Sequence, residues 1–154
     1  MNRSGLGAIA MAVFAYAAPA TVRAEEAMLR AASATELKAD SRGHFIVQAE
    51  INGRDIWVMV DTGATAVALS YEDAKEAGLR PGSLDFNIPI TTANGVGMAA
   101  RVKLDRVEID GVRVYDVDGM VLPGGALRGS LLGMSYLSRL RGFKVEDGVL
   151  YLED

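Results

Sequence analysis

The stretch WVMVDTGATAVAL, residues 57–69, places one acid inside an otherwise apolar run. Runs of this kind are typical of buried strands, and an ionised carboxylate that is buried alone is too unfavourable to persist. Gly63 lets the chain turn sharply after Asp61, and Thr62 supplies a hydroxyl that can bond to the neighbouring backbone. The stretch therefore predicts a tight polar loop at the end of a central strand, with the Asp61 carboxylate held in a fixed position.

A structural Asx-turn, in which Asp61 bonds to its own backbone two residues on, is the alternative interpretation of this loop. The flanking sequence favours a functional loop instead. Apolar residues precede the acid without a break, and a second apolar pair that ends in glycine, LLG at residues 131–133, comes directly before a predicted helix. Two such motifs in one short chain are more specific than the tripeptide DTG alone.

Composition excludes several classes of protein. The chain has 154 residues and a net charge of −4, which suits one globular domain without the basic surplus of a nucleic-acid binder. It contains no cysteine, so disulfides and thiolate chemistry are excluded. His44 is the single histidine, which rules out a multi-histidine zinc site, and we predict no metal and no cofactor.

The first 24 residues have the layout of a secretory signal. Arg3 precedes an alanine-rich apolar run, and small residues at Ala18, Ala20 and Ala24 offer cleavage sites. We expect a cleaved signal over residues 1–24 and a soluble, exported, periplasmic domain. The alternative is an uncleaved anchor over residues 5–22, the one segment that could hold the chain at a membrane.

The rest of the chain reads as strands and turns. Residues 25–42 show no sustained apolar period and are interpreted as a lead-in or linker, and residues 43–154 as the domain. Both faces of residues 54–60 become apolar near the end, so this strand should be central and covered on both sides. Two short helices are predicted near residues 71–77 and 134–141. Hairpin turns are expected at Asn52-Gly53, Asn94-Gly95, Asp110-Gly111, Asp118-Gly119 and Asp147-Gly148. The pattern predicts an all-β domain in the form of a small closed barrel.

Three segments of the sequence resemble the retropepsin-like aspartic proteases, in particular the exported bacterial members. GHFIVQAEINGRDIWVMVDTGATAVALSYEDAKEAGL is similar to their amino-terminal half, and TTANGVGMAARVKL lies where they carry a glycine-containing flap hairpin. SLLGMSYLSRLRGFKVEDGVLYL is similar to their second apolar-apolar-Gly motif, with its helix and closing hairpin. The resemblance covers residues 43–152 and implies a homodimeric retropepsin-like barrel.

The resemblance implies that Asp61 is the catalytic residue of an aspartic endopeptidase. Thr62, Gly63 and Ala64 would support the active loop, with the Thr62 hydroxyl reaching across a dimer axis. Ala64 offers no hydroxyl to an ionised carboxylate, so we expect activity to peak in mildly acidic to near-neutral conditions.

Two further groups of residues receive roles from the resemblance. Asn94, Gly95 and Val96 would form the tip of the flap and bind substrate, although an ordinary exposed hairpin has the same Asn-Gly signature. Leu132 and Gly133 would pack behind the active loop.

Peptide hydrolysis by this chemistry needs two carboxylates that share one proton, and the chain contains a single DTG. We therefore predict a homodimer with one Asp61 from each subunit, acting on an extended peptide segment of a protein in the cell envelope. The alternative function is a catalytically silent retropepsin-like module for interaction or dimerisation. A small-ligand-binding β-barrel is a third possibility.

Overall fold

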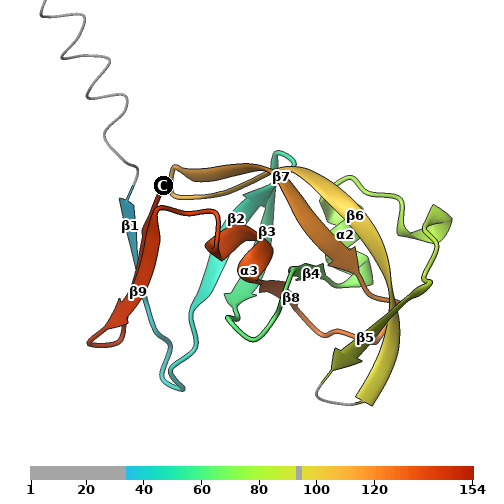
Figure 1. The fold of residues 1–154 in the computed structure, drawn as a ribbon, viewed down its shortest axis with the longest axis horizontal. Coiled ribbons are helices and arrows are strands. Elements are labelled where there is room, and N and C mark those ends of the chain that lie inside the picture. Colours follow the sequence, from blue (N-terminus) through green and yellow to red (C-terminus); the bar gives the residue numbers. More distant parts are fainter. Residues whose placement is uncertain (1–33, 93–94) are drawn as a thin grey trace, which may run out of the picture. The chain divides into compact units, whose positions relative to one another are not determined.

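Strand β3 (Arg54–Val60), which leads to Asp61, is an interior strand of a closed barrel. The computed structural model describes residues 34–92 and 95–154. Around the barrel the strands follow the order β2-β3-β8-β4-β7-β6, and the end of β6 pairs back onto β2, while β5 pairs with the first residues of β6 (Figure 1). The other strands of this sheet are β2 (Ile46–Ile51), β4 (Val67–Leu69), β5 (Ile88–Thr92), β6 (Gly95–Ile109), β7 (Val112–Val121) and β8 (Ser130–Leu132). The predicted small all-β barrel is confirmed.

Alternating burial along the strands fills the barrel with branched aliphatic side chains. In β2 and β3, for example, Ala49, Ile51, Ile56 and Val58 are buried while their neighbours are more exposed. The period of two puts every second residue inside. These side chains, together with those of β6 and β7, form a single core cluster.

Two-residue hairpins connect several of the strands, as the sequence predicts. Both turn residues have the left-handed backbone that Asn, Asp and Gly tolerate, with φ between 47° and 89°. They are Asn52-Gly53 between β2 and β3, Asp110-Gly111 between β6 and β7, and Asp147-Gly148 between β9 (Gly142–Glu146) and β10 (Val149–Glu153).

The prediction of a turn at Asp118-Gly119 is wrong. Both residues lie inside the continuous strand β7, where Asp118 is opposite Lys103 and Gly119 is opposite Val102. A β-carbon on Gly119 would lie 3.1–3.3 Å from side-chain atoms of Val102 and Leu104. The glycine is therefore required for close packing inside the barrel and does not mark a turn.

The outer face of β3 is only partly covered by the described chain, whereas the sequence predicts cover on both sides. Trp57 is 63% exposed and Met59 is half-buried. The strand is central within its sheet, between β2 and β8. Its apolar outer face is therefore available to a ligand or a partner.

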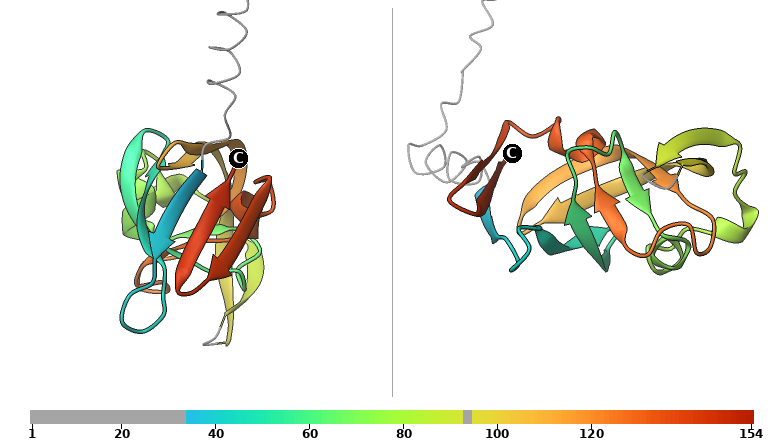
Figure 2. Two further views of the ribbon diagram at one scale, coloured as in Figure 1. Left: turned by 90° about the vertical axis from the view of Figure 1, so that its left-hand side faces the viewer. Right: turned by 90° about the horizontal axis from the view of Figure 1, so that it is seen from below.

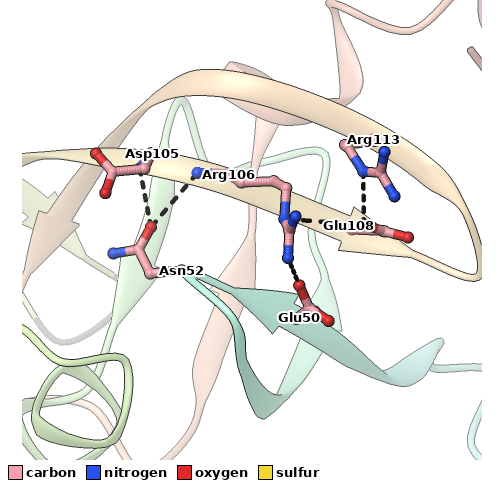
Figure 3. A network of polar contacts seen from close by, with 6 residues as sticks. All are labelled: Glu50, Asn52, Asp105, Arg106, Glu108 and Arg113. Carbon is pink, nitrogen blue, oxygen red and sulfur yellow. Dashed lines mark hydrogen bonds and ion pairs between the residues drawn. The ribbon is translucent and has the colours of Figure 1, made fainter.

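Polar contacts fasten the closure between β2 and β6 (Figure 3). Asn52 Oδ1 accepts hydrogen bonds from the backbone N–H groups of Asp105, at 2.8 Å, and Arg106, at 3.4 Å. The Arg106 guanidinium donates to Glu50 and also forms an ion pair with Glu108 at 3.8 Å. These contacts hold the two strands together where their ladder is only two residue pairs long.

A separate three-stranded sheet contains the chain's last two strands (Figure 2). Its order is β1-β10-β9, and β1 (Ala34–Lys38) pairs with the whole of β10. The segment interpreted as a lead-in or linker, residues 25–42, therefore includes a strand, Ala34–Lys38, that pairs within the domain. The alternation of small, polar and apolar side chains in this strand is too weak a signal to predict it without its partner strand.

Two short helices flank the site strands. α2 (Tyr71–Glu76) begins at the predicted cap, because Ser70 Oγ accepts from the Asp73 N–H at 3.0 Å, and it is followed by Gly78 with φ +79°. α3 (Met134–Leu137) is shorter than predicted, and Gly142 begins β9 instead of closing the helix. A single 3-10 turn, η1 (Pro81–Ser83), follows α2. Within residues 34–92 and 95–154 no helix has the length and apolar character to cross a membrane.

Candidate active site

Asp61 is half-buried at the carboxyl end of β3, in a loop that fixes its side chain. The Gly63 N–H donates to Asp61 Oδ1 at 2.8 Å, and the Ala64 N–H donates to the Asp61 carbonyl at 3.2 Å. The Asx-turn considered above is thus present. It orients one carboxylate oxygen and leaves Oδ2 without a hydrogen bond from the residues that the structure describes.

Gly63 and Thr62 complete this loop. Both are exposed. A β-carbon on Gly63 would lie 3.1 Å from Asp61 Oδ1, which is closer than side chains normally approach. The glycine therefore leaves room for the carboxylate in the position that the turn gives it.

The apolar-apolar-Gly motif lies directly behind the loop. The Asp61 N–H donates to the Leu132 carbonyl at 3.1 Å, and the Met134 N–H donates to the Ala64 carbonyl at 2.8 Å. Leu132 is fully buried, and β8 runs parallel to β3 with Leu132 opposite Val60. The two segments, about 70 residues apart in the sequence, are thus joined on both sides of Gly133.

Gly133 allows the closest approach in this arrangement. A β-carbon there would lie 2.2 Å from the Ala66 carbonyl oxygen and 2.7 Å from the Ala64 carbonyl oxygen. Both obstacles are backbone atoms, which cannot rotate away. Only glycine therefore lets β8 pass against the active loop.

Ser135, which the sequence analysis did not single out, fixes the far end of the loop. Its Oγ accepts from the Val67 N–H at 2.9 Å and donates to the Asp118 carbonyl at 2.6 Å. One hydroxyl therefore connects the start of β4 to β7. A serine at the start of a helix is a common cap, so the residue type by itself gives no signal of this long-range role.

An apolar row runs across the outer face of the sheet beside the loop. Register places Met59 opposite Ile46 on one side and Leu131 on the other, with Ala68 opposite Leu131 and Met120 opposite Ala68. Residues directly opposite one another point to the same face. Four of the five are half-buried and Ile46 is 47% exposed, so this row is an open apolar surface next to Asp61.

The hairpin predicted as a flap is formed by β5 and the start of β6. Thr92 is opposite Gly95, whose φ is +112°, and Val96 is 79% exposed. Asn94 lies outside the described residues. The structure thus presents Val96 to solvent at the end of a two-stranded arm, and its role in binding substrate stays a prediction.

Few titratable groups lie in the active loop. Asp61 is the only titratable group among the loop residues 61–66. Within the described chain no three His, Cys, Asp or Glu side chains gather as metal ligands. Lys103 on β6 lies beside Asp118 on β7, with Nζ 2.7 Å from Oδ1, and lowers the pKa of that carboxyl.

Comparisons with known proteins place this geometry in context. Residues 47–139 match the family described as "gag-polyprotein putative aspartyl protease". The chain is 42% identical over 112 residues to an uncharacterized protein encoded in the cobV 5' region of a Sinorhizobium species, and 41% identical over 110 residues to an uncharacterized protein of Rickettsia prowazekii. These alignments cover 73% and 71% of the chain but 48% and 47% of the relatives, so the chain spans about half the length of both.

Two solved structures show the same fold. A retropepsin-like aspartic protease from Rickettsia conorii matches with a TM-score of 0.72 and 37% identity, over 79% of this chain and 91% of that one. The protease of EIAV, solved with the inhibitor HBY-793, matches with a TM-score of 0.55 and 18% identity, over 67% and 93% of the two chains. The second match shows similarity of the fold alone.

Proposed function

Because the chain belongs to the retropepsin-like aspartic protease family, we propose that it is an endopeptidase whose active site contains Asp61 from each of two subunits. The observation that carries the proposal is the Asp61 loop. Its carboxylate is oriented by Gly63, and its backbone is joined to the Leu132 segment behind it. Such a fixed carboxylate is what acid–base catalysis requires.

Two facing carboxylates hydrolyse the peptide bond, one as general base and the other as general acid. The ionised Asp61 takes a proton from a water molecule as the water oxygen attacks the peptide carbonyl carbon. The protonated Asp61 of the partner subunit donates its proton to the carbonyl oxygen. The tetrahedral diol then collapses and the C–N bond breaks. One diol hydroxyl gives its proton to the partner's Asp61 as the carbonyl re-forms, and the leaving amine takes the proton that the first Asp61 received from water. One carboxylate cannot perform both roles at once, which is why the proposal requires a dimer.

Among the described strands β9 pairs only with β10, and its other edge supports self-association. Val145 is 61% exposed and Phe143 is 36% exposed on this strand, which is an outer strand of the three-stranded sheet. Antiparallel pairing of two β9 strands, with Val145 opposite its own copy, would set Lys144 opposite Glu146 of the partner subunit in both directions. The apolar surface is thus complementary to a second copy, and Lys144 and Glu146, which form an ion pair at 2.8 Å within one chain, would face the opposite charge across the contact.

Substrate binding follows from the open apolar row. An extended peptide beside Asp61 would bury its apolar side chains against Met59, Leu131 and Ala68, while the arm that carries Val96 covers it from the other side. We expect the substrate to be a protein segment in the cell envelope, because residues 1–24 have the character of an export signal.

Replacing Asp61 by Asn tests the proposal. Asparagine keeps the shape of the side chain but cannot exchange a proton, so Asp61→Asn should abolish cleavage of a peptide library, measured by sequencing the new amino termini. Asp55→Asn, an exposed position on the same strand, serves as the matched control and should cleave like the wild type. If neither the wild type nor Asp61→Asn cleaves the library at concentrations where the chain is dimeric, the silent interaction module becomes the better interpretation.

A further inference from the structure

A pocket of about 370 Å³ lies at the outer end of the apolar row. Thr65 and Ala66, which continue the active loop, form one side of it, and Met120, the last member of the row, forms another. Arg101 completes this part of the lining and is directly opposite Met120 in the register of β6 and β7. The pocket is therefore continuous with the surface on which the proposed substrate lies.

The charge in and around this pocket is positive. Asp118 is the one acid among the lining residues, and its carboxylate already accepts a hydrogen bond from Lys103 at 2.7 Å. Lys103, then Arg101 and Arg139, lower the pKa of Asp118, so the positive charges that act on this carboxylate outnumber it. Arg101 is exposed, and no hydrogen bond or ion pair within the described residues engages its guanidinium.

Register along the apolar row sets which part of a substrate could reach Arg101. Arg101 lies four strand spacings from Met59 along this row, which is about 19 Å at about 4.8 Å per spacing. The long Arg101 side chain spans part of that distance, and an extended peptide rises about 3.3 Å per residue. A peptide whose scissile bond lies at Asp61 and which follows the row would therefore bring its third or fourth residue from that bond within reach of Arg101.

We infer that Arg101 is a specificity-determining residue that selects an acidic side chain, Glu or Asp, at the third or fourth substrate position from the scissile bond. The inference rests on the proposed function and refines it. A planar guanidinium beside an apolar wall suits a carboxylate on a flexible stem, because the carboxylate accepts two parallel hydrogen bonds. Two-fold symmetry would repeat the pocket, so the preference should exist on both sides of the scissile bond.

Matched peptides test this inference. Peptides with apolar residues at the scissile bond, and Glu, Gln or Lys at the third and fourth positions, are compared by kcat/KM for the full chain. We expect Glu to exceed Gln by about threefold to fivefold and Lys by about tenfold, as for partly exposed charge pairs. The preference should shrink at high salt. Arg101→Gln should remove it, and Arg101→Glu should reverse it in favour of Lys.

Arg54→Gln is the control variant, because Arg54 is exposed at the opposite end of β3 from Asp61, and it should keep the wild-type ratio. Equal cleavage of the Glu and Lys peptides by the wild type would overturn the inference while leaving the protease function intact.

Binding of the same peptides, labelled with fluorescein, to Asp61→Asn gives a second readout that needs no catalysis. If the wild type cleaves nothing, the proposed function fails. The ratio of Kd values in Asp61→Asn with and without Arg101→Gln then decides the inference, and equal or undetectable binding overturns it.

Discussion

At the scale of single residues, two glycines place the Asp61 carboxylate. Gly63 leaves room beside Oδ1, and Gly133 lets β8 pass against the carbonyls of Ala64 and Ala66. Neither glycine has a left-handed backbone. Their value lies in the missing β-carbon, which lets two backbone segments approach more closely than any side chain would allow.

Gly133→Ala should therefore destabilise the protein strongly. The added β-carbon would meet the Ala66 carbonyl at 2.2 Å, so the backbone of the active loop must move. We expect a loss of about 3 kcal/mol in the free energy of unfolding, measured by urea denaturation. Gly124→Ala is the matched control, since a β-carbon there meets nothing within 4 Å. An unchanged midpoint for Gly133→Ala would show that the loop and β8 are not packed as described.

A second residue-scale prediction concerns pH. Ala64 follows the DTG and provides no hydroxyl, and the structure shows one hydrogen bond to the Asp61 side chain, from the Gly63 N–H. A serine hydroxyl at position 64 would stabilise the ionised carboxylate. Ala64→Ser should therefore move the acidic limb of the pH–kcat/KM profile to lower pH, while the wild type peaks in mildly acidic to near-neutral conditions. A wild-type optimum near pH 2–3 would contradict this expectation.

At the scale of elements, the three-residue strand β8 is held to α2 by a buried hydrogen-bond network. Ser130 Oγ donates to Asp73 Oδ2 at 2.5 Å and accepts from the Ser70 N–H at 3.1 Å, while Ser70 Oγ caps α2 through the Asp73 N–H. Ser130 is 1% exposed and Ser70 is 4% exposed. This hydrogen-bond network attaches the start of α2 to the strand that supports the active loop.

Ser130→Ala should therefore lower stability by about 1–3 kcal/mol, because it leaves the buried Ser70 N–H and the Asp73 carboxylate without a partner. Calorimetry would measure the lower Tm. Ser83→Ala provides the comparison, since the Ser83 hydroxyl bonds to the Arg80 carbonyl at an exposed site, and should change stability by less than about 0.5 kcal/mol. A similar small effect at both positions would show that the hydrogen-bond network contributes little to stability.

At the scale of the whole molecule, the proposed enzyme is incomplete as one chain. If two copies assemble through β9, specific activity should rise with protein concentration and level off once the dimer is saturated. Val145→Asp would place a charge in that apolar contact and should raise the dimer Kd by at least about tenfold, as measured by analytical ultracentrifugation. Tyr115→Asp, at a similarly exposed apolar residue on β7, should leave the Kd unchanged. A wild type that cleaves peptides as a monomer would refute the dimeric dyad.

Local patterns in the sequence were sufficient for the barrel class, the two-residue hairpins and the cap of α2. Asn-Gly and Asp-Gly pairs between alternating strands select such turns through their own backbone preferences. The same signal failed at Asp118-Gly119, where packing against Leu104 requires the glycine. It also gave no indication of β1, whose strand conformation depends on pairing with β10 at the other end of the chain.

The sequence by itself determined the chemistry that this protein could perform: one carboxylate in a DTG loop, a second apolar-apolar-Gly motif, and neither cysteine nor a histidine cluster. These depend on residue type and short spacing, which the sequence states directly. Tertiary structure decided what surrounds that carboxylate, namely the Leu132 contact behind it, the apolar row beside it and the Arg101 pocket beyond it. Those features join strands that are far apart in the chain, and only closure of the barrel brings them together.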